Sequence, residues 1–241
     1  MSQSPQLTKL LAELNKLADK HQALILQRFF KTGPGQYGAG DIFLGIKVPL
    51  QRQVAKKYQH LSLAEISKLL GNPFHEARLV GLLILVEQYE AATTKQLKAT
   101  LVDFYLKHQS AINNWDLVDL SAPKILGDFL WQNPKQRSIL TKLARSHNLW
   151  SRRIAIVATF AFIKHGQSRE TLKIAKILIN DQHDLIHKAV GWMLREVGKR
   201  IKRSVLEDFL RKQVNFLPRI TLRYSLEHFS KSEREKYLKI N

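Results

Sequence analysis

The sequence predicts an all-α protein in which about a dozen helices are joined by short turns. Between Leu7 and Ala18, leucines and other apolar residues recur every three and four positions, as one buried helix face requires. Period-two alternation is scarce, and the chain contains no Asn-Gly or Asp-Gly pair to connect two strands as a hairpin. With 44% hydrophobic and 24% charged residues, the 241-residue chain has the composition of a folded globular protein.

Similar apolar stripes predict helices along the rest of the chain. These stripes cover residues 54–70, 77–89, 97–106, 139–143, 154–163, 172–179 and 186–197. Ser62 together with Glu65 predicts a capping box at one helix start. Ser168, with Glu170 in the following turn, predicts a second N-cap.

A glycine-rich stretch is the one long segment without a helical pattern. Residues 31–45 contain five glycines and a proline, which favour turns over helix. We therefore predict a single domain that has N-terminal helices at residues 1–31. A glycine-rich loop follows at 32–48, and helical repeats follow at 49–241.

Basic residues recur near the starts of four apolar segments. They are Arg78, Arg153, Lys188 and Arg219, separated by 75, 35 and 31 residues. Two-helix units of about 35–40 residues are typical of HEAT-like solenoids, and an irregular helical bundle with coincidental spacing is the alternative. Because equivalent positions of a solenoid line one concave face, the spacing predicts a basic groove that fits a nucleic-acid duplex.

The charge balance predicts a polyanionic partner. The chain has 39 Lys and Arg against 20 Asp and Glu, a formal net charge of +19. DNA, RNA and anionic membrane surfaces are the candidate partners, and a generally basic, highly soluble surface is the alternative. The chain starts without the pattern of a signal peptide, and its longest apolar runs are shorter than the roughly 20 residues that span a bilayer. We expect a soluble cytoplasmic protein that does not associate with membranes.

Several kinds of catalytic or cofactor site are excluded or disfavoured. The chain has no cysteine, which rules out disulfides, iron–sulfur clusters and a cysteine nucleophile. The GPGQYG motif at residues 33–38 fits a dinucleotide fingerprint, but no predicted strand precedes it. His183 and His187 could share one helix face, but no third metal ligand accompanies them. We therefore expect no metal and no cofactor.

A tryptophan and an aspartate form the most informative cluster. Trp115 and Asp119 are four residues apart, so on a helix they project from one face, with Asp116 near its edge. Acidic side chains on a phosphate-binding face oppose binding unless they have another role, such as catalysis. An N-cap or a salt bridge to Arg153 is the alternative interpretation.

Four motifs resemble the AlkD-type DNA alkylation repair proteins, which are HEAT-like DNA glycosylases of bacteria. They are NWDLVD at residues 114–119, LWSRR at 149–153, KAVGWMLRE at 188–196 and FLGIKVP at 43–49. The resemblance implies that Asp119 is the catalytic carboxylate and that Trp115 and Trp192 contact the sugar. It also implies that Arg153 contacts DNA beside Arg152, and that Tyr37 lies near the lesion.

The resemblance implies a DNA glycosylase that excises N3- or N7-alkylpurines from double-stranded DNA. From the repeat spacing, we expect Arg78, Lys188 and Arg219 to contribute to DNA binding. Such a protein would work as a monomer, without an obligate protein partner, in the bacterial cytoplasm with access to the nucleoid. A non-catalytic HEAT-like module that binds DNA or RNA is the main alternative. A scaffold for an acidic protein is a third.

Overall fold

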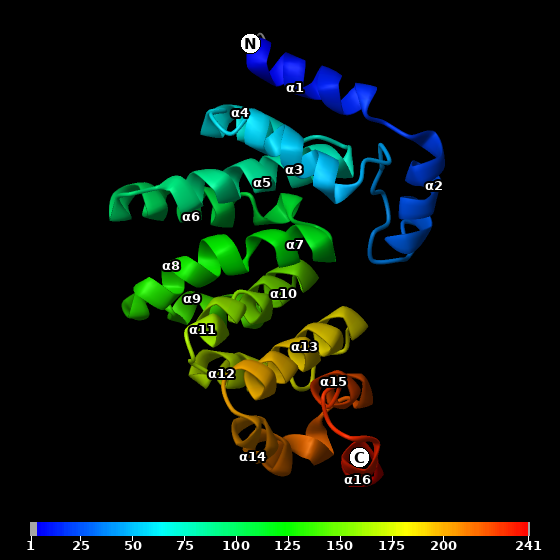
Figure 1. Cartoon of the computed structure of the whole chain (residues 1–241), viewed down its shortest axis with the longest axis vertical. Helices are drawn as coiled ribbons and strands as arrows, with labels where there is room; N and C mark the ends of the chain where they lie inside the picture. Colours follow the sequence, from blue (N-terminus) through cyan, green and yellow to red (C-terminus); the bar gives the residue numbers. More distant parts are fainter. Residues whose placement is uncertain (1–3, 241) are drawn as a thin grey trace. The chain divides into compact units, whose positions relative to one another are not determined.

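The computed structural model describes residues 4–240 and contains sixteen α-helices and no β-strand within that range (Figure 1). The chain divides into two compact units, Met1–Ser121 and Ala122–Asn241. The first unit contains α1 (Pro5–Lys16), α2 (Lys20–Phe29), α3 (Val48–Lys57), α4 (Leu63–Leu70), α5 (His75–Ala91), α6 (Lys95–Lys107) and α7 (Trp115–Ser121). The second contains α8 (Asp128–Gln132), α9 (Ser138–Ala144), α10 (Leu149–Val157), α11 (Phe160–Lys164), α12 (Arg169–Ile177), α13 (Asp184–Arg200), α14 (Arg203–Gln213), α15 (Arg219–Ser225) and α16 (Lys231–Ile240).

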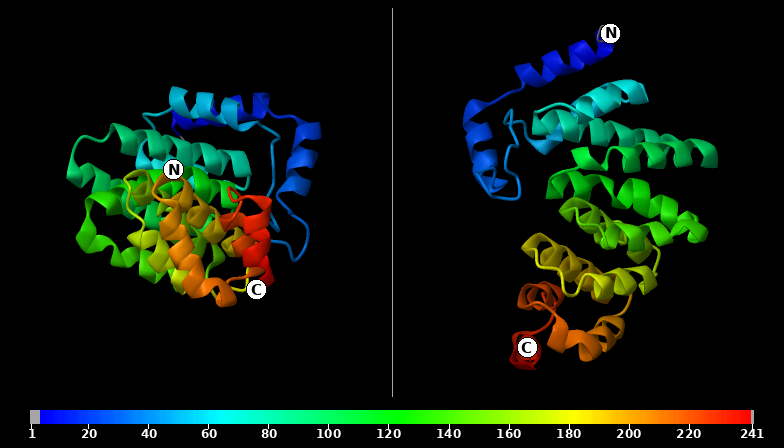
Figure 2. Two further views of the ribbon diagram at one scale, coloured as in Figure 1. Left: turned by 60° about the horizontal axis from the view of Figure 1, so that its bottom comes forward. Right: turned by 180° about the vertical axis from the view of Figure 1, so that it is seen from behind.

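The first unit is organised around α5. Every residue of α5 from His75 to Val86 is buried, because α1, α3, α4, α6 and α7 all pack against this helix. Its apolar residues surround the helix and do not form a single stripe, which is the pattern of a fully buried helix. As Figure 2 shows, the chain runs from α2 through an extended loop back to α3. Residues 32–47 contain no helix, and α3 begins at Val48, the last residue of the predicted glycine-rich loop.

The second unit is organised around α13, which packs against α10, α11, α12, α14 and α15. Gly191 allows α13 and α15 to approach closely. A Cβ atom at Gly191 would lie 2.5 Å from Cβ of Tyr224 and 2.7 Å from the carbonyl oxygen of Thr221. Packing of consecutive helices in both units, such as α4 with α5 and α9 with α10, confirms the predicted all-α helical-repeat class.

Gly191→Ala is expected to lower the free energy of unfolding by about 2 kcal/mol, because the added methyl group overpacks the contact between α13 and α15. Gly71→Ala is the matched control, since a Cβ there meets nothing closer than 3.6 Å. Urea denaturation followed by circular dichroism measures both variants. Equal stability of the two variants would contradict the close approach at Gly191.

Two predicted stripes are each divided between two helices. The stripe at 54–70 is interrupted after α3, where the amide of Leu61 donates to the carbonyl of Tyr58 in a turn. The stripe at 154–163 is interrupted between α10 and α11, where the hydroxyl of Thr159 donates to the carbonyl of Ile156. Apolar periodicity continues through both turns because both sides of each turn face the same core. The predicted helix start at Ser62 already divides the first stripe, whereas the prediction of one continuous helix over 154–163 was wrong.

The two predicted helix caps have different outcomes. Ser62 and Glu65 form the expected reciprocal capping box at the start of α4. Ser168 precedes α12 as predicted, but its side chain makes no capping hydrogen bond. Among the helices described, none is both long enough and apolar enough to cross a membrane.

Candidate functional site

Helix α7 carries the predicted tryptophan and aspartate one turn apart. Trp115 is the first residue of the helix, and the side chains of Trp115 and Asp119 are both half-buried. Helical periodicity projects them from one face. Asp119 lies near Tyr105. Burial raises the pKa of the Tyr105 phenol, and the negative charge of Asp119 also raises it, whereas a hydrogen bond to Ser121 lowers it in part. The Asp119 carboxylate is thus partly solvent-accessible, beside a phenol that stays protonated.

Two phenylalanines at the end of α2 complete an aromatic cluster with Trp115. The Trp115 ring stacks on Phe30, with centroids 5.1 Å apart, and meets Phe29 edge-on at 5.8 Å. Phe30 is buried, whereas 61% of Phe29 is exposed. The sequence interpretation missed this pair, whose signal is two adjacent aromatics just before the glycine-rich loop. Phe29 therefore offers an exposed apolar surface next to the predicted catalytic helix.

A buried histidine connects α5 to both α7 and the glycine-rich loop. Nδ1 of His75 lies 3.0 Å from Oδ2 of Asp41, and its Nε2 lies 2.8 Å from Oδ2 of Asp116. The second oxygen of Asp116 accepts from the amide of Leu117 at 2.9 Å. Asp116 lies inside the first turn of α7, and Asn114, the residue before the helix, accepts from the amide of Trp115 at 2.8 Å.

The two carboxylates determine the protonation state of His75. Burial alone would lower its pKa, but hydrogen bonds to Asp116 and Asp41, together with their charges, raise the pKa to about 9. For Asp41, burial would raise the pKa, but His75, Arg78 and Asn114 outweigh it and hold the pKa below its usual value. The cluster therefore contains ionised groups of both signs at neutral pH.

Glu76 holds the end of the glycine-rich loop against α5. Its buried carboxylate accepts hydrogen bonds from the amides of Leu44, Gly45 and Ile46 at 2.9, 2.8 and 3.1 Å. Gly45 has a φ of +88°, and a Cβ there would lie 2.0 Å from the carbonyl oxygen of Asp19. Only glycine fits this position without displacing backbone.

Arg78 is occupied inside the first unit. Its side chain is 7% exposed, pairs with Asp41 and donates to the carbonyls of Asn72 and Pro73, both at 3.0 Å. These contacts fasten the turn that precedes α5. A contact of Arg78 with DNA stays a prediction. These internal bonds argue against it, because they already use the guanidinium group.

Arg152 repeats the local bonding of Arg78. Arg78 bonds the carbonyls five and six residues before it, and Arg152 does the same with His147 and Ser146 at 2.9 and 3.1 Å. These two arginines are 74 residues apart, whereas the sequence spacing paired Arg78 with Arg153, 75 residues away. Arg152 also forms an ion pair with Asp181.

The other predicted residues of the second unit lie on or beside α10 and α13. Arg153 is buried and donates to the carbonyl of Leu185 at 2.7 Å. Trp192 on α13 is half-buried, with its ring 6.1 Å from that of Phe160. Arg219 donates to the carbonyl of Leu238 at 3.2 Å. The structure thus brings together Trp115 and Asp119 in the first unit, and Arg153 and Trp192 lie in the second.

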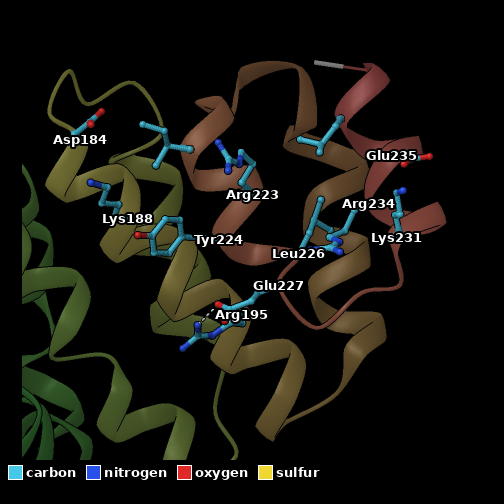
Figure 3. A pocket seen from close by; sticks show the side chains of 12 residues that line it. Asp184, Lys188, Arg195, Arg223, Tyr224, Leu226, Glu227, Lys231, Arg234 and Glu235 are labelled. Atoms are coloured by element: carbon cyan, nitrogen blue, oxygen red, sulfur yellow. Dashed lines mark hydrogen bonds and ion pairs between the residues drawn. The ribbon is translucent and has the colours of Figure 1, made fainter.

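Lys188 lines an open cleft of about 850 Å³ formed by α13, α15 and α16 (Figure 3). Figure 3 shows Lys188 and Lys231 projecting from opposite sides of this cleft. Five basic side chains and three carboxylates line it, so its surface is mixed in charge and only moderately basic. The basic side chains of the cleft could bind phosphate groups. The carboxylates of Asp184 and Glu227 would repel any phosphate bound close to them.

The remaining motifs have structural roles. His183 caps α13 by accepting from the amide of Leu185, and His187 bonds the carbonyl of Asp181. No group of three potential metal ligands occurs among residues 4–240. Tyr37 lies in the glycine-rich loop, and its hydroxyl donates to the carbonyl of Phe29 at 3.5 Å.

The fold defines this chain as an all-α helical-repeat protein. Within that class, it belongs to the DNA alkylation repair enzyme family, whose sequence model matches residues 10–229. The structure is similar to a solved structure described as a predicted DNA alkylation repair enzyme from Enterococcus faecalis. The TM-score is 0.68 at 16% identity, with 89% of this chain and 97% of that chain covered. No curated protein matches the sequence.

Proposed function

We propose that this protein is a DNA glycosylase that removes positively charged N3- or N7-alkylpurines from double-stranded DNA. Membership of the DNA alkylation repair enzyme family supports a role in alkylation repair. The observation that carries the specific reaction is the pair on α7, where half-buried Asp119 stands one turn from the aromatic face of Trp115. The negative charge of Asp119 would repel DNA phosphates, so a carboxylate at that place favours a catalytic role over DNA binding alone.

The chemistry needs one carboxylate and no strong acid. An N3- or N7-alkylated purine is cationic, so it leaves as a neutral base when the C1′–N bond breaks. The sugar then acquires oxocarbenium character, which the negative charge of Asp119 stabilises. Asp119 also positions the water whose oxygen bonds to C1′, and the water's proton passes to the carboxylate or to solvent. The products are the free base and an abasic site.

Aromatic and basic residues support this step. The ring faces of Trp115 and Trp192 would attract the cationic sugar through their quadrupoles. Arg153 would contact a phosphate near the lesion and keep the strand in register. Phe29, which the structure places against Trp115, would extend the apolar wall beside the same sugar.

The assay incubates the purified protein with methylated duplex DNA and measures released 7-methylguanine and 3-methyladenine by mass spectrometry. Alkaline cleavage of the strand reports the abasic sites. We expect base release by the wild-type protein and none above background by Asp119→Asn. If both proteins bind the duplex equally and neither releases base above background, the enzyme hypothesis fails and the non-catalytic binding module stands.

Lys188→Ala is expected to reduce the salt dependence of duplex binding. A lysine that neutralises one phosphate contributes about 0.9 to the slope of log K against log salt concentration, so the slope should become shallower by that amount. Arg78→Gln is the control, because Arg78 is occupied by Asp41 and two carbonyls and should leave the slope unchanged. Fluorescence anisotropy between 50 and 200 mM salt measures both. A shallower slope for Arg78→Gln alone would contradict this assignment.

A further inference from the structure

We propose that His75 is a positioning residue: its imidazolium, held between Asp41 and Asp116, connects the glycine-rich loop to the first turn of α7 and fixes the place of Trp115 and Asp119. No family motif or sequence pattern pointed to His75. Its importance follows from the contacts that it makes across the first unit.

The imidazole ring of His75 is held in one orientation by its neighbours. His75 is 1% exposed, and each of its nitrogens lies within 3.0 Å of a different carboxylate oxygen. Its ring stacks on Phe43 with centroids 4.5 Å apart and lies 5.2 Å from Phe30, which also stacks on Trp115. The side chain is therefore held by hydrogen bonds at both edges and by aromatic rings at its face.

The geometry favours the doubly protonated ring between two ionised carboxylates. A neutral imidazole has one N–H group, so its other nitrogen would point a lone pair at a carboxylate oxygen about 3 Å away. The charged groups around His75 are Asp41 from the loop, Asp116 from α7, and Arg78 and Glu76 from α5 itself. Arg78 pairs with Asp41, so that two cations balance two aspartates, while Glu76 is satisfied by the loop amides.

The link from His75 to the candidate site passes through the start of α7. Asp116 binds His75 with one oxygen and the amide of Leu117 with the other. Next to it, buried Asn114 donates to Asp41 at 2.9 Å and accepts from the amide of Trp115 at 2.8 Å. Both residues that flank Trp115 are therefore fixed by the Asp41–His75 pair, and Asp119 follows one turn later.

Hydrogen exchange tests the positioning without any assumption about activity. In His75→Gln, the glutamine can donate to only one of the two aspartates, so the peptide covering residues 112–121 should exchange at least tenfold faster. Peptides from α3 and α4 should be unchanged. His108→Gln is the control, because His108 is another hydrogen-bonded histidine of the first unit, half-buried and bonded to Ser67 and the Phe104 carbonyl. Unchanged exchange in residues 112–121 of a folded His75→Gln protein would overturn the proposal.

Nitrogen-15 NMR of labelled histidine tests the charge state directly. We expect both nitrogens of His75 to be protonated at pH 7.5 and to titrate near pH 9, the raised pKa of this ring. Asp116→Asn removes one charge and keeps a side-chain oxygen that can accept from the amide of Leu117, so the titration should move toward lower pH. A neutral ring at pH 7.5 in the wild-type protein would overturn the proposed bridge.

The effect on catalysis rests on the proposed function. Under single-turnover conditions, His75→Gln should release 7-methylguanine at least tenfold more slowly while binding undamaged duplex within twofold of wild type. The wild-type rate should fall as pH rises through about 9, where the bridge loses its proton, and this limb should shift to lower pH in Asp116→Asn. An unaltered rate and pH profile in His75→Gln would overturn the positioning role. Absence of base release from the wild type would overturn the proposed function instead. The hydrogen-exchange experiment would then still test whether His75 positions the start of α7.

Discussion

Asp119→Asn is expected to lower the single-turnover rate of alkylpurine release by at least about 100-fold, the usual effect of losing one preorganised charge that stabilises a transition state. Asparagine has nearly the same size as aspartate, so packing on α7 should be preserved. Its neutral amide cannot stabilise the developing positive charge on the sugar. Because the sugar acquires its positive charge only as the C1′–N bond breaks, the loss should appear in the rate of bond cleavage and not in DNA affinity.

Asp103→Asn is the control for this experiment, because Asp103 is an exposed acid on α6 of the same unit. It removes one negative charge from the protein without touching α7. Rapid-quench assays with a duplex containing one 7-methylguanine measure the rate, and anisotropy measures affinity. If Asp119→Asn and Asp103→Asn cleave at the same rate, Asp119 does not perform the chemistry.

Glu76→Ala is expected to lower the free energy of unfolding by about 4 kcal/mol. Three backbone amides of the glycine-rich loop donate to this fully buried carboxylate, and each buried amide left without a partner costs about 1–3 kcal/mol. Water that enters the space left by the carboxylate recovers part of this cost. The melting temperature should fall by roughly 10 °C for a chain of this size.

Glu87→Ala on the same helix is the comparison, because Glu87 is half-buried near the other end of α5. It should change stability by less than about 0.5 kcal/mol, as surface substitutions usually do. Calorimetry and urea denaturation measure both proteins. A loss below 1 kcal/mol in Glu76→Ala would mean that the loop amides find other partners, and that the loop is not anchored by α5.

Local patterns predicted the helices well and their junctions poorly. The capping box of Ser62 and Glu65 lies within four residues, so the sequence contains the whole interaction. The division between α10 and α11 depends on how both helices pack on a common core, which apolar periodicity does not record. The same limit applies to Arg152 and Arg153: the sequence alone does not show which of two adjacent arginines matches Arg78, and the structure shows that Arg152 makes the same bonds.

The sequence by itself determined the all-α class, the basic character and the family motifs, because helix periodicity, charge and short motifs are properties of neighbouring residues. It also put two aspartates, Asp116 and Asp119, in one short motif without separating their roles. Only the tertiary structure decided that Asp116 binds His75, a residue 41 positions earlier in the chain. Packing of α5 against α7 brings those side chains together, and no local pattern encodes that contact. Asp119, one turn further along α7, is left half-exposed beside Trp115 for the proposed chemistry.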